Sequence, residues 1–361
     1  MKRRDVLKSG LVLAGTTALA APAIAQSAPS IRWRLTSSFP KSLDTIYGGG
    51  EFFADRVSKL TDGKFNIRVF AAGDLMPAFS ALDGVQQGTV EMCHTASYDY
   101  VGKDFTMGFG TALPFGLTTR QQNAWMYHAG GLDTMNAFFK DYGVIAYPAG
   151  NTGAQMGGWF RNPVNTMADF KGLKMRIPGL GGQVMARIGA VPQALPGGDI
   201  YPALERGAID ATEWVGPYDD EKLGFYKIAK NYYYPGWWEP CSMYHVMINI
   251  QKWETLPKQY QEAVISACRE TNLDMVAEYD AKNREALIRL KAAGVQFHKF
   301  SDEIMEGSYK AAITMYEEEA AKNAKFKAIY QGWKKFQAEE AQWFALTESA
   351  LDQFYTAKLK I

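Results

Sequence analysis

The sequence is poor in histidine and cysteine, the side chains that most often bind transition metals or carry covalent chemistry. Its 361 residues include four histidines and three cysteines. No CxxC pair occurs, so a zinc or thiol–disulfide redox site is not expected. Cys93, Cys241 and Cys268 could form at most one internal disulfide, and we expect each of them to be a small buried apolar side chain.

An excess of charge of either sign is also absent. Lysine and arginine together number 39, and aspartate and glutamate together number 38. A general nucleic-acid-binding protein normally shows a basic surplus or a basic patch, so no nucleic-acid partner is expected. The balance does not exclude a small anionic ligand, because such a ligand needs only one well-placed cation.

Long apolar runs are missing too. The run from Gly10 to Ala21 is shorter than the roughly 20 residues that span a bilayer, and no later run reaches that length. It follows the basic pair Arg3-Arg4 and precedes Ala23-Ile24-Ala25, a small-residue cleavage site. This layout predicts an export signal of the twin-arginine type over residues 1–25, and a mature protein outside the cytoplasm.

Familiar catalytic patterns are missing as well. No HExxH or GxSxG motif occurs, and the glycine-rich stretches complete neither GxGxxG nor a Walker loop. A pair of catalytic carboxyl groups, as in glycosidases, could come from the acids Glu213, Asp219, Asp220 and Glu221. Their spacing along the chain does not give the distance between two carboxyl groups in space. For Asp219, Asp220 and Glu221 we expect a solvated turn that enters a helix at Lys222. Glu213 stays open among a catalytic acid, a cation ligand and a solvated side chain.

The chain does show an alternation of strands and helices. "IRWRLTSS" and "FNIRVF" have the pattern of strands, and helical spacing extends over Leu43–Leu60 between them. The alternation continues to about Val144 and predicts an α/β layer with a mostly parallel sheet. A second, similar unit begins near Pro163 with the strand "GLKMRI".

The second unit continues with two predicted helices around a short strand at Val191. The helices cover Gln183–Ile188 and Ile200–Arg206. Asp199 is placed to cap the second of them, and Gly207 is placed to end it.

After Trp253 the chain is mainly helical to its end. Apolar residues recur there at spacings of three or four, among them Leu256, Tyr260, Val264 and Cys268. Packing across the back of both units is the favoured reading of this stripe. A dimer or partner surface is the functional alternative.

One internal echo relates the two units. "LDGVQQGTVEMCHT" and "YPALERGAIDATEW" each show a helix, a terminating glycine and a short apolar strand. Aligned on Gly88 and Gly207, residues 94–95 fall on residues 213–214. Both pairs would then lie at carboxyl ends of corresponding strands, where open α/β sheets bind ligands. The echo therefore predicts one cleft shared by the two units.

Arg176 is the natural partner for an anion in such a cleft. It stands on the strand face opposite Met175, immediately before Pro178-Gly179. A guanidinium binds a carboxylate through two parallel hydrogen bonds. Taken alone, Arg176 could equally be an ordinary surface arginine.

Several segments resemble the extracytoplasmic solute receptors of TRAP transporters. The resemblance is carried by the twin-arginine leader, "GNTGAQMGGWF", "GLKMR" and "GGDIYPALERGAIDATEWVGPYDDEKLGFYKIAKNYYYPGWWE". It covers essentially the whole mature chain, and the long last segment is specific. More narrowly, the chain is similar to the branch that binds 2-oxo or 2-hydroxy monocarboxylates.

The resemblance implies a two-lobed α/β periplasmic binding protein fold of the type II-like kind. Each lobe would be a mixed sheet flanked by helices, with long C-terminal helices spanning both lobes. We expect residues 26–152 and about 241–280 to form the first lobe. Residues from about 153 to 240 and 281–361 would form the second lobe and the C-terminal helices.

The same resemblance implies a site with an arginine and a metal ion. Arg176 would bind the carboxylate of the ligand. The metal ligands would be the Gln155 amide oxygen, the Glu213 carboxylate, the Trp214 carbonyl and the Glu239 carboxylate, completed by two substrate oxygens. An all-oxygen shell suits Ca²⁺ or Na⁺. Two carboxylates, a monoanion and one arginine sum to minus two, so charge counting favours Ca²⁺.

Further pocket candidates rest on position alone, and each could equally have a packing role. The polar candidates for contacting the substrate are Asn151, Thr95, Tyr98 and Tyr100. Phe39 and Trp159 are candidates for the pocket wall. Trp237 and Trp238 are expected to form wall and core beside Glu239, with a carbohydrate-stacking platform as the other interpretation.

We therefore expect a periplasmic receptor that captures a small monocarboxylate and delivers it to the permease subunits of a TRAP system. The ligand would be a 2-oxo acid such as pyruvate or a 2-hydroxy acid such as lactate, since one metal-bound oxygen serves both. A homodimer through the C-terminal helices is possible. The alternatives are an exported receptor for sugars or sugar acids, and an exported metal-dependent enzyme acting on small acids.

Overall fold

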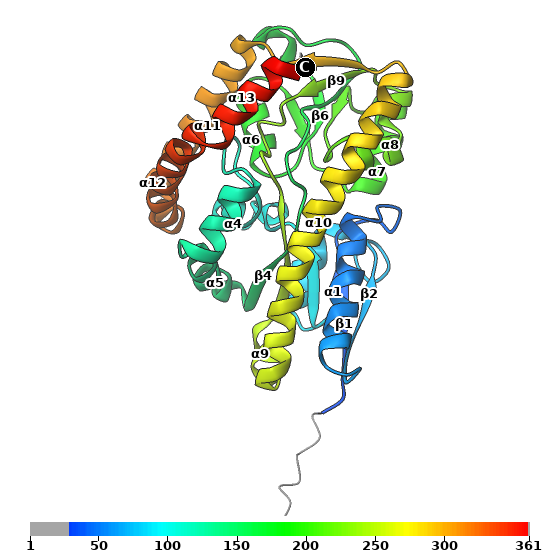
Figure 1. Ribbon diagram of the computed structural model, residues 1–361, viewed down its shortest axis with the longest axis vertical. Helices are drawn as coiled ribbons and strands as arrows, with labels where there is room; N and C mark the ends of the chain where they lie inside the picture. Colours follow the sequence, from blue (N-terminus) through cyan, green and yellow to red (C-terminus); the bar gives the residue numbers. More distant parts are fainter. Residues whose placement is uncertain (1–28, 360–361) are drawn as a thin grey trace, which may run out of the picture.

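Two mixed β-sheets, one above the other in Figure 1, form the two lobes of the protein. The computed structural model describes residues 29–359, so the predicted export signal lies outside the described residues. The first sheet has the order β2-β1-β3-β10-β4, and the second has the order β11-β9-β5-β8-β6-β7. The two-lobed α/β fold with mixed sheets is confirmed.

The first sheet is half parallel and half antiparallel. Strands β1 (Ile31–Ser37), β2 (Phe65–Phe70) and β3 (Met92–Thr95) run parallel, whereas β10 (Met243–Asn249) is antiparallel to both β3 and β4 (Val144–Asn151). The prediction of a mostly parallel sheet was wrong here. Strand β10 returns from the second lobe, and its direction follows from that crossing rather than from a local strand–helix–strand unit.

The second sheet contains three parallel and two antiparallel pairs. Strand β5 is antiparallel to both of its neighbours, β8 and β9. The strands are β5 (Gly158–Phe160), β6 (Lys174–Arg176), β7 (Val191–Gln193), β8 (Ala211–Thr212), β9 (Asn231–Tyr234) and β11 (Gln296–Lys299).

Short helices cover the faces of the sheets and long helices follow them in the chain. The helices of the first lobe are α1 (Ile46–Leu60), α2 (Ala81–Gln86), α3 (Gly108–Thr111), α4 (Thr119–His128), α5 (Gly131–Phe139) and α9 (Ile250–Thr255). Those of the second lobe are α6 (Gly179–Arg187), α7 (Gly197–Glu205) and α8 (Pro217–Leu223). The remaining helices are α10 (Lys258–Ala292), α11 (Asp302–Lys322), α12 (Ala324–Leu346) and α13 (Glu348–Leu359).

Helix α7 begins earlier than predicted. Its N-cap is Pro196, so the prediction that Asp199 caps the helix was wrong; Asp199 lies within the first turn. The Trp214 ring packs on Gly197, where an added Cβ would lie 2.7 Å from the ring, and this contact favours glycine at the start of the helix. Gly207, with φ +72°, follows the helix end as predicted.

The internal echo between the units is a structural correspondence. Gly88 and Gly207 have the same φ of +72°. A carboxylate then accepts a backbone N–H in each lobe: Glu91 from Arg34 at 2.8 Å, and Asp210 from Lys174 at 3.1 Å. These contacts tie β3 to β1 and β8 to β6, so the two strand pairs have matching registers.

Helix α10 is the element that joins the lobes along their length (Figure 1). Its 35 residues extend over about 50 Å, packing on α1 and β4 in the first lobe and on α8 in the second. Tyr260, Val264 and Cys268 are buried in the first-lobe core, which confirms the packing interpretation of the apolar stripe. Cys93 and Cys241 are also buried, and all three cysteines are free.

Two chain segments cross between the lobes beside this helix. Thr152 donates its backbone N–H to Ser242 at 3.0 Å, and Gly236 donates to the carbonyl of Gln155 at 3.0 Å. The crossings are therefore bonded to one another and hold residues near 155 and 239 at the junction. Within residues 29–359 no helix combines the length and apolar character needed to cross a membrane.

A polar cluster also bridges the lobes at the surface. The Asp44 carboxylate, in the segment before α1, accepts the Tyr218 hydroxyl at 2.9 Å and forms an ion pair with Lys222. Tyr218 and Lys222 lie on α8 of the second lobe, and Lys282 of α10 approaches the same carboxylate at 3.5 Å. The Asp44 cluster, defined by these four residues, holds the two lobes together.

We predict that Asp44→Ala opens the lobes slightly because these contacts join the first lobe to the second. The expected cost is on the order of 1 kcal/mol, since the charges are partly solvated, and it should shrink at high salt. Small-angle scattering of ligand-free protein at low salt should give a larger radius of gyration than wild type. Asp55→Ala, which breaks the Asp55–Lys59 ion pair within α1, is the matched control. Scattering identical to wild type would contradict the interlobe role.

Candidate anion and cation site between the lobes

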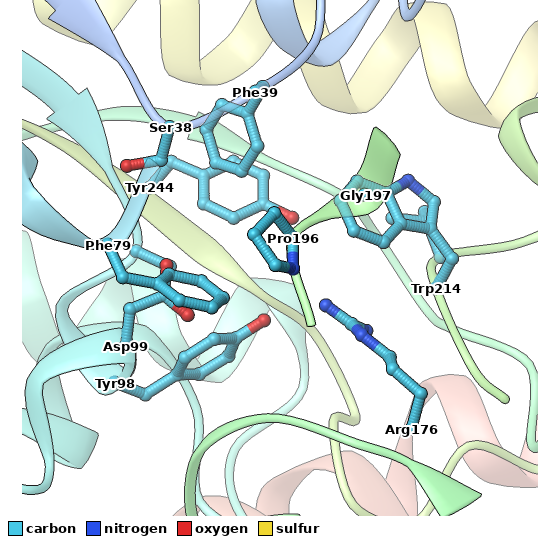
Figure 2. Close-up of a pocket in the computed structure, with 12 residues that line it drawn as sticks. Ser38, Phe39, Phe79, Tyr98, Asp99, Arg176, Pro196, Gly197, Trp214 and Tyr244 are labelled. Carbon is cyan, nitrogen blue, oxygen red and sulfur yellow. The ribbon is translucent and has the colours of Figure 1, made fainter. Parts of the chain in front are cut away.

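A pocket opens between the lobes where segments of both meet. Figure 2 shows the Tyr98 and Tyr244 hydroxyls pointing toward its middle, with the Arg176 guanidinium facing them from the second lobe. The first lobe contributes Ser38, Phe39, Phe79, Ala96, Tyr98 and Asp99, and β10 contributes Tyr244. The second lobe contributes Arg176, Pro196, Gly197, Trp214 and Val215.

Arg176 ends strand β6 and turns into this pocket. Its side chain is 5% exposed, whereas Lys174 on the same face is exposed, because only the carboxyl end of the strand lies under the other lobe. Nε donates to the Leu195 carbonyl at 3.0 Å, and the guanidinium lies 5.0 Å from the Trp214 ring. These contacts fix the plane of the guanidinium before any ligand arrives.

Glu213 follows strand β8 and lies beside Arg176. The two side chains form a buried ion pair, and Arg176 Nη1 also donates to the Glu213 carbonyl at 3.2 Å. Among the described residues, Glu213 Oε2 has no hydrogen-bond partner although it is buried. Burial raises the pKa of Glu213 well above its ordinary value, Arg176 opposes the rise, and the nearby Glu239 carboxyl adds to it.

Glu239 approaches the pocket from the second crossing segment. It is 3% exposed, and Tyr98 donates its hydroxyl to Glu239 Oε2 at 3.4 Å. Burial raises the pKa of Glu239 to about 7, against the opposing effect of Arg176. The charges of Glu213 and Glu239 thus act on one another. The single guanidinium of Arg176 is too little to balance both carboxylates.

Gln155, on the first crossing segment, brings an amide oxygen to the same place. Its Nε2 donates to the Thr152 hydroxyl at 3.1 Å, which orients the amide. In the part of the chain that the structure describes, the buried Gln155 Oε1 accepts no hydrogen bond. The backbone contact between Gly236 and Gln155 places this residue close to the segment that carries Glu239.

These groups fit a hard cation. Within residues 29–359 no donor bonds to the buried oxygens Gln155 Oε1 and Glu213 Oε2. Glu239 is a buried carboxyl of raised pKa, and the Trp214 carbonyl lies next to Glu213 in the chain. Oxygen-only donor sets suit Ca²⁺ or Na⁺ rather than a thiophilic metal. Within residues 29–359 no cluster of three or more histidine, cysteine, aspartate or glutamate side chains could hold a metal, and the set here has two acids completed by neutral oxygens.

The prediction of a solvated turn at Asp219 and Asp220 was wrong. Both carboxylates are buried, in the first turn of α8. Asp220 accepts hydrogen bonds from the Trp159 indole at 2.9 Å, the Tyr232 hydroxyl at 2.7 Å and the Val215 backbone at 3.2 Å. Aromatic donors from distant segments satisfy this acid, and spacing along the chain does not reveal them.

Asp219 holds the neighbouring tryptophan. It accepts the Trp214 indole N–H at 3.2 Å and the Tyr279 hydroxyl of α10 at 2.7 Å. Asp219 therefore fixes Trp214 to the long interlobe helix. Trp214 supplies both the candidate carbonyl ligand and the ring that packs on Arg176. Glu221, by contrast, is partly exposed and pairs with Arg289.

The other predicted ligand contacts divide into two groups. Tyr98 and Phe39 line the pocket (Figure 2), whereas Thr95 and Tyr100 lie behind it, bonded to one another at 3.0 Å. Asn151 is fully buried at the crossing, and its Oδ1 accepts the Gly153 backbone N–H at 2.9 Å. Hence the structure brings together only part of the predicted set.

The aromatic candidates pack in the interior. Trp159 stacks on Tyr232 with ring centroids 3.8 Å apart, and it is not among the residues that line the pocket. Trp237 and Trp238 are 3% and 1% exposed, and Trp237 stacks on Phe115. A carbohydrate platform needs an open aromatic face, so that interpretation is contradicted.

Sequence reasoning missed several pocket residues, chiefly Asp99, Tyr244, Phe79 and Ser38. Asp99 directly follows Tyr98, which was predicted, so the neighbouring acid could have been included. Tyr244 is the second residue of β10, a strand that is buried along its whole length and carries no motif. Only the pairing of β10 with the first sheet places it here.

The chain belongs to the family of bacterial extracellular solute-binding proteins, family 7, whose model matches residues 36–323. It is 50% identical over 360 residues to the monocarboxylate 2-oxoacid-binding periplasmic protein of a Nostoc species, covering 98% of this chain and 99% of that one. The family therefore extends across both lobes, and the fold and class that the motifs indicated are confirmed.

Solved structures of the family resemble this one closely. A TRAP transporter solute-binding protein from Bordetella bronchiseptica is 49% identical with a TM-score of 0.91, covering 92% of this chain and 99% of that one. It is described as a mixed-occupancy dimer with copurified calcium and picolinate bound at one site. A protein from Pseudoalteromonas atlantica, with sodium and pyruvate bound, is 36% identical with a TM-score of 0.87, covering 90% of this chain and 99% of that one.

The buried acids predict how the stability of the metal-free protein depends on pH. Burial raises the pKa of Asp219 and Glu239 to about 7, so the folded state binds more protons there than the unfolded state. The free energy of unfolding should therefore fall as pH rises from about 6.5 to 8. His94 and His245, whose pKa values burial lowers, have the opposite effect, but mainly below that range.

Urea titrations of chelator-treated protein across this range measure the effect. Glu239→Gln removes one of the raised groups and should make the dependence on pH shallower. Glu254→Gln, at an exposed position on α9, is the control and should leave the dependence unchanged. A wild-type stability that stays constant or rises from pH 6.5 to 8 would contradict the assignment.

Proposed function

We propose that this protein captures a small 2-oxo or 2-hydroxy monocarboxylate in the periplasm and delivers it to the membrane permease of a TRAP system. The observation that carries the proposal is the buried Arg176 guanidinium, which faces the pocket between the lobes and lies beside buried oxygens of Glu213, Glu239 and Gln155. A relative at 50% identity bears the name of a 2-oxoacid-binding protein, which supports this class of ligand.

Arg176 supplies the recognition of the ligand's carboxylate. Its Nε and Nη1 are already bonded within the second lobe, so the guanidinium is oriented without cost at the moment of binding. Tyr98 and Tyr244 add hydroxyls from the other side (Figure 2). A ligand that contacts both sides favours the closed arrangement of the lobes, and only such a preference can drive closure.

Gln155, Glu213, Glu239 and the Trp214 carbonyl would hold the cation. Bound there, Ca²⁺ would balance the charge of the two acids and Na⁺ would offset half of it, and either ion would attract the oxygens of the ligand. Two carboxylates, a monoanion and one arginine sum to minus two, which favours Ca²⁺. Relatives with pyruvate bound contain calcium in one case and sodium in another.

The proposal is binding without turnover, in keeping with a family of solute-binding proteins. Export through the signal over residues 1–25 and cleavage near Ala25 belong to the same proposal. The name of the Nostoc relative as a periplasmic protein supports this location.

A thermal-shift screen of small acids tests the function, since bound ligand raises apparent stability. We expect pyruvate or lactate to raise the melting temperature with Ca²⁺ or Na⁺ present, and the shift to vanish with chelator. Arg176→Ala should weaken binding about a hundredfold, the cost of losing a buried charged partner. Glu213→Gln should weaken the cation-dependent part with little effect on folding.

Arg289→Ala is the control, because its partner Glu221 lies outside the pocket. Equal shifts with and without chelator would contradict a role of the cation in ligand binding. Near-native affinity of Arg176→Ala would contradict the role of Arg176 in binding the carboxylate. Stabilisation by neutral sugars alone would favour a sugar receptor. Recovery of the ligand unchanged by NMR supports binding rather than turnover.

We also propose a homodimer through the C-terminal helices. The end of α12 and the whole of α13 expose large apolar side chains, with exposed fractions of 58% for Trp343, 81% for Leu346 and 55% for Phe354. Exposed apolar surface of this kind is typical of an interface. The Bordetella relative is described as a dimer.

The mass in solution tests the homodimer. Light scattering should give about twice the chain mass for the wild type, because an apolar patch of this kind is stabilised by burial. Phe354→Asp should shift the protein to the monomer without loss of helicity. A monomeric wild type at micromolar concentration would contradict the proposal.

A further inference from the structure

Asp99 is a pocket residue that the proposed function does not use. It lies on the short 3₁₀ segment Ser97–Tyr100 after β3, and its side chain is partly exposed to the pocket beside Phe79 and Tyr98 (Figure 2). Among residues 29–359, no donor forms a hydrogen bond with its carboxylate. The charge of Arg176 attracts this carboxylate, but Arg176 already pairs with Glu213. An acid without a hydrogen-bond donor, facing a pocket for an anion, calls for an explanation.

A second cavity continues from the ligand pocket at this residue. The two share Phe79, Tyr98 and Asp99 among their lining residues. The second cavity has a volume of about 260 Å³, well above the roughly 10–15 Å³ needed to hold one water. A ligand several carbons longer than pyruvate therefore has room, and size alone does not limit the tail.

The walls of the second cavity are uncharged apart from Asp99. They include the apolar side chains of Val101, Ile177 and Pro192, with Gln183 as the polar exception. Gly179 of the second lobe, at φ +59°, lies so near Tyr98 that an added Cβ would be 3.0 Å from its ring. The lobes thus meet closely at this edge of the cavity, whereas Gly102, Gln183 and Ala194 on its other side are exposed.

The balance of charge in the two cavities decides which tails are tolerated. Arg176 is the one cation among their lining residues, and it is already paired with Glu213. A second carboxylate on the ligand would lie beside Asp99 with no cation of its own. Like charges that lie close together disfavour binding, and such repulsion is a common basis of specificity.

We propose that Asp99 is a specificity-determining residue, which admits 2-oxo monocarboxylates with uncharged tails into the second cavity and rejects 2-oxo dicarboxylates. The inference rests on the proposed function, because the carboxylate bound by Arg176 determines which end of the ligand reaches Asp99. The family contains receptors for both kinds of acid: a relative from Rhodobacter capsulatus, 25% identical over 325 residues, is named as a C4-dicarboxylate-binding protein.

Two acids of equal length separate the effect of charge from that of size. Titration calorimetry compares 2-oxopentanoate with 2-oxoglutarate, with pyruvate as a reference without a tail, in the presence of Ca²⁺. Burial raises the pKa of Asp99 to about 7, so measurements at pH 8 keep it ionised. We expect the wild type to prefer 2-oxopentanoate over 2-oxoglutarate by about a hundredfold or more.

Asp99→Asn removes the charge and keeps the shape. It should reduce that preference about tenfold or more, chiefly by strengthening 2-oxoglutarate binding, and should change pyruvate affinity less than about threefold. Asp99→Ser repeats the test with a smaller side chain. Asp55→Asn, at an exposed position on α1, makes the same change of net charge far from the pocket and should alter nothing.

Each other outcome has a distinct meaning. An unchanged preference in both variants, with pyruvate binding retained, would overturn the role of Asp99 and leave the proposed function standing. Equal wild-type affinity for the two five-carbon acids would also overturn it. Loss of all binding in both folded variants would show that Asp99 is structural instead. A wild type that binds none of the three acids would overturn the proposed function, and this inference with it.

Discussion

The burial of two carboxyl groups beside a single guanidinium is the constraint on which the rest of the site depends. Glu213 and Glu239 lie in the interior with raised pKa values, and Arg176 offsets only part of their charge. An ionised carboxylate without compensation is costly in a protein interior. Such an arrangement is stable when further positive charge joins it, and it then presents a neutral or positive surface to an organic anion. The components of the proposed binding site therefore need one another.

The fold meets this constraint by bringing four separate segments to one point. Strand β6 ends at Arg176 and the adjacent strand β8 ends directly before Glu213, and the two crossing segments carry Gln155 and Glu239. Because the crossings join the lobes, movement of the lobes changes the site directly. Asp219 and Tyr279 connect the same point to the long helix α10, which packs on both lobes. Ligand capture and lobe closure thus share their structural elements.

Much of the fold could be predicted from local pattern, and the site only in part. The predictable features depend on residues close together in the sequence. They are the alternating strands, the glycine after each echo helix, and the apolar stripe from Leu256 to Cys268. The buried acids do not follow such rules. Asp219 and Asp220 have the composition of a solvated turn, but they accept hydrogen bonds from Trp159, Tyr232 and Tyr279, whose approach depends on the tertiary fold. Asp99 and Tyr244 likewise reach the pocket only through pairing and packing between distant segments.

A crystal structure of the protein with pyruvate and Ca²⁺ tests the central claim most directly. The account predicts one cation bound by oxygens of Gln155, Glu213, Trp214 and Glu239 at about 2.3–2.6 Å, with the ligand's carboxylate on Arg176. A ligand bound in the pocket with no cation, and with Glu213 and Glu239 bonded only to protein donors, would contradict it.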